Sequence, residues 1–165
     1  MRSKYLAGLA RKHGWKAGAE IGVWYGKTFF HLLDNVPDLV LFGVDAWVPL
    51  DERYTHHRNV SENRSEVMIK TLEYGCRAHI LSLPSIEASK KFVDGALDFV
   101  FIDGDHSIDG VKADIAAWYP KVKIGGFLTG HDWDWESVRI GVTELLPDVK
   151  AGREDNDYVW TWRKQ

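Results

Sequence analysis

The stretch at residues 19–28, which reads A-E-I-G-V-W-Y-G-K-T, limits what this chain can fold into more than any other part of the sequence. A short apolar run with a carboxylate leads to one glycine, a second glycine follows four positions later, and residues 29–33 have helical apolar spacing. This order predicts a strand, a tight turn and a helix. In such a unit the turn lies at the carboxyl edge of a parallel sheet, where glycines admit a ligand and the helix offers free N–H groups. We therefore expect a ligand site at this turn.

Spacing separates the ligand classes that such a turn could serve. A dinucleotide fingerprint needs G-x-G-x-x-G, but Trp24 stands where the central glycine would admit a pyrophosphate. A P-loop needs four residues between its first glycine and G-K-[ST], whereas three residues separate Gly22 from Gly26. Both phosphate-binding patterns are disfavoured, and an ordinary structural turn stays open as an alternative.

The rest of the chain predicts an alternation of strands and helices. Residues 39–44 are a near-continuous apolar run, as is typical of a parallel strand buried on both faces, and Asp45 follows it. Asp45 lies 23 positions after Gly22, where an acid can accept both hydroxyls of a ribose, although a role as a turn or cap residue is the alternative. Further strands are predicted at 78–81, 97–103 and 123–130, a closing antiparallel hairpin at 149–150 and 158–162, and helices within 1–16 and at 62–74, 108–118 and 138–146.

Composition narrows the partners and the compartment. The 165 residues suit a single α/β domain, and 21 basic against 24 acidic side chains give a formal net charge of -3 without a basic block, so nucleic acid is not an expected partner. No run of about 18 apolar residues and no signal-peptide core is present, so we expect a soluble, cytoplasmic protein without a membrane span. The single Cys76 excludes an internal disulfide and a cysteine metal cluster.

Four polar side chains follow the fourth and fifth predicted strands: Asp103, His106, His131 and Asp132. Because parallel strands end at the same edge of a sheet, these side chains should converge beside the glycine turn. The alternative is that Asp132 caps the next turn and His131 is a buried, hydrogen-bonded residue. Residues 47–59 are predicted to form a long loop over the site, with the pair His56 and His57 in solvent rather than on a metal.

Three motifs resemble the class I S-adenosylmethionine-dependent methyltransferases, above all the small macrocin-type and catechol-type O-methyltransferases: E-x-G-x-x-x-G-x-[ST] at 20–28, F-I-D-G-D-H at 101–106 and K-I-G-G-F-L-T-G-H-D-W at 123–133. The resemblance covers residues 17–165. It implies one S-adenosylmethionine-binding domain over residues 1–165, with a three-layer Rossmann-like α/β fold. Its seven-stranded, mostly parallel sheet would have the order 3-2-1-4-5-7-6 and an antiparallel last strand. The implied activity is methyl transfer to a small-molecule acceptor, with hydroxyl groups as the expected target.

The resemblance also assigns the cofactor site. Glu20 can face the ammonium group of the cofactor, whereas the helix N-terminus after the turn can face its carboxylate. Many relatives carry an aspartate near the adenine amino group just after the third strand, where this chain has Pro84, so Ser85 or backbone groups near it are expected to take over. The full set of expected cofactor contacts comprises Glu20, Gly22, Trp24, Gly26, Lys27, Thr28, Asp45, Ala46, Trp47, Ser85 and Asp103, with Ala46 and Trp47 against the ring.

A divalent cation and a general base are implied in the same way. In metal-dependent relatives the acid that ends strand four and a pair that ends strand five hold the ion, which here gives Asp103, His131 and Asp132. A histidine in that pair departs from the usual acidic or amide pair, and it favours manganese, iron or zinc over magnesium or else stays outside the shell. His106 falls where the relatives carry a general base, and an unperturbed histidine pKa of about 6.5 suits proton removal near neutral pH.

Three alternatives stay open at this stage. One is a metal-independent N-methyltransferase, a second is a non-catalytic cofactor-binding protein that serves as an interaction module, and a nucleotide-binding enzyme is the third. Tyr158, Trp160 and Trp162 alternate onto one face, which predicts core packing or the contact of a homodimer. The acceptor has no recognisable code in the loop at 47–59 or in the rim at 133–135.

Overall fold

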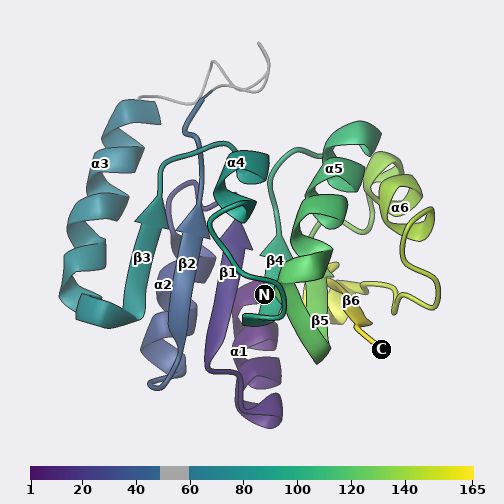
Figure 1. Cartoon of the computed structure of the whole chain (residues 1–165), viewed down its shortest axis with the longest axis horizontal. Helices are drawn as coiled ribbons and strands as arrows, with labels where there is room; N and C mark the ends of the chain where they lie inside the picture. The colour runs from purple at the N-terminus through teal and green to yellow at the C-terminus, as the bar shows by residue number, and fades with distance from the viewer. Residues whose placement is uncertain (49–59) are drawn as a thin grey trace.

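The computed structural model describes residues 1–48 and 60–165 (Figure 1). Six strands form one sheet in the order β3-β2-β1-β4-β5-β6, in which every neighbouring pair is parallel except β5 and the antiparallel β6. The strands are β1 Ala17–Ile21, β2 Val40–Val44, β3 Ala78–Leu81, β4 Leu97–Ile102, β5 Val122–Gly130 and β6 Trp160–Arg163. The expected α/β architecture with an antiparallel last strand is therefore confirmed.

The expected count of seven strands is wrong for the described residues. The segment at 149–150 makes only an isolated bridge, in which Lys150 and Thr161 exchange two backbone hydrogen bonds of 2.9 and 3.1 Å. Asp148 just before it has a positive φ of 60°, and Gly152 just after it packs against the Tyr158 backbone, so the chain turns away on both sides of one residue pair. A strand cannot extend between two such turns.

Within residues 1–48 and 60–165, six α-helices cover the sheet: α1 Arg2–His13, α2 Lys27–Asn35, α3 Val60–Thr71, α4 Ser85–Ser89, α5 Ile108–Trp118 and α6 Glu136–Thr143. The described residues also form three 3-10 helices, each of which comes before a strand: η2 Leu72–Arg77, η3 Tyr119–Lys121 and η4 Glu154–Asn156. In Figure 1, α1 and α2 lie behind the sheet, whereas α4 and α5 lie in front of it. None of the described helices combines the length and the apolar composition that crossing a membrane requires.

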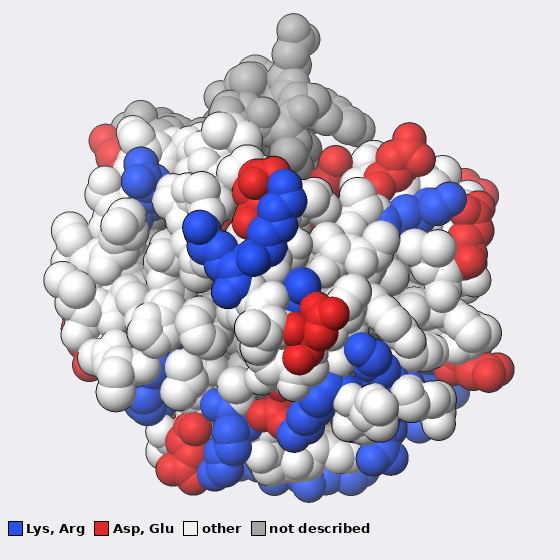
Figure 2. Space-filling view, in the orientation of Figure 1, with Lys and Arg blue, Asp and Glu red and all other residues white. Residues whose placement is uncertain are grey.

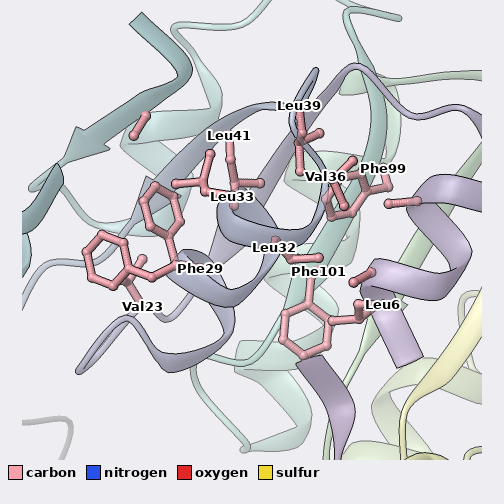
Figure 3. Packing of buried hydrophobic residues seen from close by; sticks show 14 of the residues in the cluster. Leu6, Val23, Phe29, Leu32, Leu33, Val36, Leu39, Leu41, Phe99 and Phe101 are labelled. Carbon is pink, nitrogen blue, oxygen red and sulfur yellow. The ribbon is translucent and has the colours of Figure 1, made fainter. Parts of the chain in front are cut away.

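The core consists of two apolar clusters, one on each face of the sheet. All six residues of β4 are buried, and alternate side chains serve opposite faces. Phe99 and Phe101 join the cluster beneath α1 and α2, whereas Val100 and Ile102 join the cluster beneath α5 and α6. Figure 3 shows the first cluster, in which Leu6 of α1 lies among the phenylalanines. This two-sided burial explains why β4 is an almost unbroken apolar run in the sequence.

The C-terminal aromatic face belongs to the core. Trp160 is fully buried in the cluster beneath α5 and α6, and Trp162 packs against the same cluster. This arrangement supports the core-packing alternative for Trp160 and Trp162, whereas Tyr158 precedes β6 and belongs to neither cluster; homodimer formation stays a prediction. Of the long loop predicted at residues 47–59, residues 49–59 lie outside the described residues, and His56 and His57 are among them.

Candidate functional site

The strand register brings the predicted site residues to one edge. Ile21 pairs with both Val44 and Ile102, and Ile102 pairs with Gly130, so β1, β2, β4 and β5 end at the same level. The residues that come directly after these ends are Gly22, Asp45, Asp103 and His131. Parallel pairing therefore places four predicted residues side by side at the carboxyl edge, which points upward in Figure 1. In the same view, Figure 2 shows basic side chains gathered along the lower edge, away from this site.

The turn after β1 requires its glycines. Gly22 has a φ of 89°, and a β-carbon there would lie 2.1 Å from the backbone oxygen of Asp103. Gly26 has a φ of 72° and caps α2, where a β-carbon would meet the ring of Phe30 at 2.4 Å. Trp24 between them also has a positive φ, of 52°, which is unusual for a bulky residue. Gly22 thus allows close packing against the Asp103 backbone and Gly26 against the Phe30 ring, while the predicted role of these glycines in admitting a ligand stays a prediction.

A cavity of about 750 Å³ opens at this edge. Its size lies within the range of small-molecule and cofactor sites, about 300 to 1,000 Å³. Two expected contacts do not line it. Gly26 acts as the cap of α2, and the side chain of Trp47 is buried in the core, where Nε1 donates to the Trp24 carbonyl at 3.2 Å. The expected packing of Trp47 on a ligand ring stays a prediction. The expected contacts that do line the cavity are Glu20, Gly22, Trp24, Lys27, Thr28, Asp45, Ala46, Ser85 and Asp103.

Asp45 is held by the backbone. Its Oδ2 accepts a hydrogen bond from the Trp24 N–H at 2.8 Å, and its Oδ1 accepts one from the Trp47 N–H at 2.7 Å. Each oxygen of a carboxylate keeps further acceptor capacity after one such bond. Asp45 is thus a pre-oriented acceptor in the cavity wall, suited to a pair of hydroxyl groups.

Glu20 is a buried acid without a complete set of partners. Glu20 is 1% exposed, and its Oε2 has no hydrogen-bond partner among the described residues. Burial, followed by the negative charge of Asp103, raises the pKa of Glu20 well above its usual range. A buried acceptor of this kind in a cavity wall is costly unless a ligand donor or cation satisfies it.

The two acids and two histidines after β4 and β5 form one cluster. His106 Nε2 lies 2.7 Å from Asp132 Oδ2 and 3.9 Å from Asp103 Oδ1, while His131 Nδ1 lies 2.9 Å from Asp132 Oδ1 and 3.5 Å from Asp103 Oδ1. Neither ring nitrogen of His106 has a well-aligned hydrogen bond among the described residues, so its contacts are those of opposite charges. Asp132 has a positive φ of 54°, a strained backbone that is typical of functional sites.

Mutual charge sets the protonation of this cluster. Burial alone would lower the pKa of His106, but the close contacts with the carboxylates of Asp103 and Asp132 outweigh burial and raise it to about 9. The same balance raises the pKa of His131 to about 9. Burial would raise the pKa of Asp132, yet the two imidazoles hold it well below its usual range. Without a cation in the cluster, the two carboxylates therefore stabilise the protonated form of His106 and hold its pKa above the unperturbed value of about 6.5.

The cluster contains donors for a cation. Asp103, His131 and Asp132 each offer one ligand atom, and these three atoms lie within 4.8 Å of one another. Two carboxylate oxygens and one imidazole nitrogen make a set that suits manganese, iron or zinc better than magnesium. The donor chemistry therefore fits a divalent ion at the predicted residues.

Arg2 belongs to this site, although no sequence pattern predicts it. From the first turn of α1 its Nε donates to Thr28 Oγ1 at 3.1 Å, and one of its terminal nitrogens lies 3.2 Å from Asp103 Oδ2. The other terminal nitrogen of Arg2, Nη1, lies 3.4 Å from Nδ1 of His131. The Arg2 backbone N–H also donates to Asp157 Oδ2 at 3.0 Å. Helical spacing predicts α1, but its reach to residues about a hundred positions away depends on how α1 packs against α2.

A family model described as "Methyltransferase domain" matches residues 19–133. Among curated proteins, the chain is 28% identical over 145 residues to "Uncharacterized protein y4gI" of Sinorhizobium fredii. That alignment covers 86% of this chain but 16% of the relative, so the chain spans a small part of the relative's length.

Solved structures share the fold across almost the whole chain. The S-adenosylhomocysteine-bound methyltransferase PaMTH1 of Podospora anserina matches with a TM-score of 0.73 and 14% identity over 99% of this chain and 77% of that one. The apo structure of CalS11, a TDP-rhamnose 3'-O-methyltransferase of calicheamicin biosynthesis, matches with a TM-score of 0.68 and 14% identity over 98% and 77% of the two chains. At these identities the likeness concerns the fold.

Proposed function

This chain belongs to the methyltransferase domain family, and on that basis we propose that it transfers the methyl group of S-adenosylmethionine to a hydroxyl of a small molecule. One observation carries the proposal: a single cavity is lined by the glycine turn, by Asp45 and by the cluster of Asp103, His106 and Asp132. A cofactor site and an acid–base site thus share one space. The similarity of fold to a sugar O-methyltransferase favours oxygen as the acceptor atom.

The cofactor half follows from the charges of the cavity wall. Asp45 would accept both ribose hydroxyls, because its two oxygens are already fixed by backbone N–H groups. Glu20 would face the positive charge of the cofactor, which would satisfy its unpartnered oxygen and lower its raised pKa. Lys27 and Thr28 at the start of α2 would face the cofactor carboxylate.

The reaction balances as an in-line displacement. The acceptor oxygen attacks the methyl carbon, the C–O bond forms as the C–S bond breaks, S-adenosylhomocysteine leaves, and the hydroxyl proton passes to the base, for which we propose His106. In the free protein two carboxylates keep His106 protonated up to a pH of about 9. Its work as a base therefore requires that Asp103 and Asp132 be engaged by another positive charge.

Asp103, His131 and Asp132 would hold a divalent ion, which when bound supplies a Lewis acid for the acceptor oxygen. The same positive charge would compete with the imidazolium of His106 for the two carboxylates and restore an uncharged ring. The Arg2 guanidinium at 3.2 Å from Asp103 favours one alternative, in which the chain itself supplies a fixed cation and methyl transfer needs no metal.

Binding and turnover together test the proposal. We expect S-adenosylhomocysteine to bind in titration calorimetry, and S-adenosylmethionine with a panel of small hydroxyl and amine acceptors to yield methylated product and S-adenosylhomocysteine by mass spectrometry. Methylation confined to amines in the presence of chelator would move the assignment to a metal-independent N-methyltransferase. Binding of ATP or NAD without binding of any adenosyl cofactor would refute the proposal.

A further inference from the structure

The cavity has two ends of different chemistry. One end holds Arg2, the histidines and the acids of the cluster. The other end, beside α4 and α5, is mostly apolar and is lined by Leu83, Pro84, Ser85, Ile86, Ala113 and Asp114. Asp114 is only 5% exposed, although an ionisable side chain is rarely buried without a reason. The proposed function uses no residue of this end.

A chain of hydrogen bonds fixes the Asp114 carboxylate. Ser85 Oγ donates to Asp114 Oδ1, and the indole Nε1 of the fully buried Trp118 donates to Ser85 Oγ at 2.9 Å. A serine hydroxyl has one proton, and here Asp114 receives it. Ser85 therefore cannot donate to a ligand in this arrangement. The predicted role of Ser85 in direct recognition is replaced by that of a positioning residue.

The second oxygen of Asp114 is not engaged by the Ser85 hydroxyl. Among the described residues, no hydrogen bond to Oδ2 is found, and a β-carbon on Gly104 would lie 3.5 Å from it. Because Asp114 lines the cavity and its Oδ1 is engaged by Ser85, Oδ2 is the oxygen left for a ligand donor. Burial raises the pKa of Asp114 to about 6, with the Ser85 bond opposing that rise and the charge of Asp105 adding to it. At neutral pH the group is a carboxylate, which can only accept hydrogen bonds.

An apolar slot with one fixed acceptor suits a flat ring that carries one N–H donor. With the ribose at Asp45 and the methionine end at Glu20, the remaining end of the cavity falls to the base of the cofactor. We propose that Asp114 is the specificity-determining residue for the adenine ring and accepts a hydrogen bond from its exocyclic amino group. This inference rests on the proposed function. It places the acid that recognises adenine on α5, because Pro84, at the position after β3 where relatives carry an aspartate, offers no carboxylate.

The preference of the protein for an adenine over a hypoxanthine ligand tests the inference. S-Inosylhomocysteine differs from S-adenosylhomocysteine by a carbonyl oxygen in place of the amino group and by a proton on N1, so at the position of the amino group it would turn a lone pair toward Asp114. We expect the unaltered protein to bind S-adenosylhomocysteine about tenfold or more tightly than S-inosylhomocysteine in calorimetry at neutral pH. Asp114→Asn should reduce that preference to about threefold or less, because an amide can donate to the carbonyl.

Two further variants make the test specific. Asp109→Asn changes an exposed acid in the first turn of the same helix and should leave the preference unchanged. Ser85→Ala should weaken the preference while Asp114 is intact, because it removes the bond that orients the carboxylate. If Asp114→Asn does not fold, the preference of the unaltered protein and the Ser85→Ala result decide the matter.

The outcomes separate this inference from the proposed function. Equal affinity of the unaltered protein for the two ligands, or a full preference retained by Asp114→Asn, would overturn the Asp114 assignment alone. No binding of S-adenosylhomocysteine to the unaltered protein would overturn the proposed function on which the assignment rests.

Discussion

At the scale of single residues, the site combines acids whose surroundings give them different tasks. Asp45 accepts two backbone N–H groups and stands ready for hydroxyls, Glu20 is buried and short of a partner, and Asp132 is held between two imidazoles. The sequence predicted all three, because each comes at or next to a strand end in a parallel sheet. Their protonation was not predictable, since it depends on distances between residues far apart in the chain.

Replacing Asp45 tests the ribose contact. Asp45→Asn keeps the shape of the side chain but removes its charge and one acceptor oxygen, so we expect the affinity for S-adenosylhomocysteine to fall about ten- to hundredfold. The matched control is Asp38→Asn, an exposed acid at the opposite end of β2 that pairs with Lys16 at 2.8 Å. Calorimetry should show an unchanged affinity for the control, and a similar loss in both variants would contradict the assigned contact.

Replacing His106 tests the base. His106→Ala should lower turnover about 10²- to 10⁴-fold because a positioned base is lost, while S-adenosylhomocysteine affinity changes little. His106→Gln should not restore turnover, since an amide cannot take up the proton. Steady-state kinetics beside calorimetry separates the two effects. Near-normal turnover in either variant would remove His106 from the mechanism.

The raised histidine pKa values also predict how stability depends on pH. The folded-state pKa of His106 and His131 is about 9, above the value of 6.5 expected when the chain unfolds. Their contribution is therefore complete below a pH of about 6.5 and is lost as the pH rises through about 9. Urea unfolding of the metal-free protein should show this decline, and His106→Gln should reduce it, whereas His31→Gln on α2 should not. An unchanged slope in His106→Gln would contradict the charge cluster.

At the scale of elements, the turn after β1 depends on its glycines, whereas helix α1 does not depend on its glycine, Gly8. Gly22→Ala forces a β-carbon against the Asp103 backbone at a φ of 89°, so we expect a loss of about 3 kcal/mol or more in the free energy of unfolding. Gly8→Ala is the control, because Gly8 lies in α1 with nothing within 4 Å of the added carbon. That change should stabilise the protein by up to about 1 kcal/mol. Equal effects in denaturant unfolding would argue against a strained turn.

Helix α1 acts as a part of the site through its first turn. Arg2→Ala removes the guanidinium from Asp103 and Thr28, and since Arg2 is about one-third exposed we expect only about 1 kcal/mol of lost stability. The same change frees the carboxylates, so manganese should raise the melting temperature more in Arg2→Ala than in the unaltered protein. Arg11→Ala, at the far end of the same helix, is the control. A smaller manganese effect in Arg2→Ala would show that Arg2 does not compete with a cation.

At the scale of the whole molecule, prediction succeeded where the chain reaches the site directly from a strand. The glycine turn, Asp45 and the pair after β5 follow from apolar runs and their ends. Arg2 and Asp114 were missed because they reach the cavity from helices, whose rotation and packing decide which side chain faces inward. The seventh strand, implied by the family resemblance, is absent among the described residues because backbone turns on both sides of Lys150 limit the pairing to one bridge.

The arrangement of the whole site also predicts that turnover depends on a divalent cation and that cofactor binding does not. Asp103, His131 and Asp132 lie at the ends of β4 and β5, whereas Asp45 and Asp114 hold the proposed ribose and base elsewhere in the cavity. Treatment with a chelator should therefore abolish turnover and leave S-adenosylhomocysteine affinity within about twofold, because the ion would serve the acceptor rather than the cofactor. Manganese should restore turnover in the unaltered protein but much less in Asp132→Asn, which loses one charged ligand. Full turnover in chelator would instead assign the positive charge at Asp103 to Arg2 and favour the metal-independent mechanism.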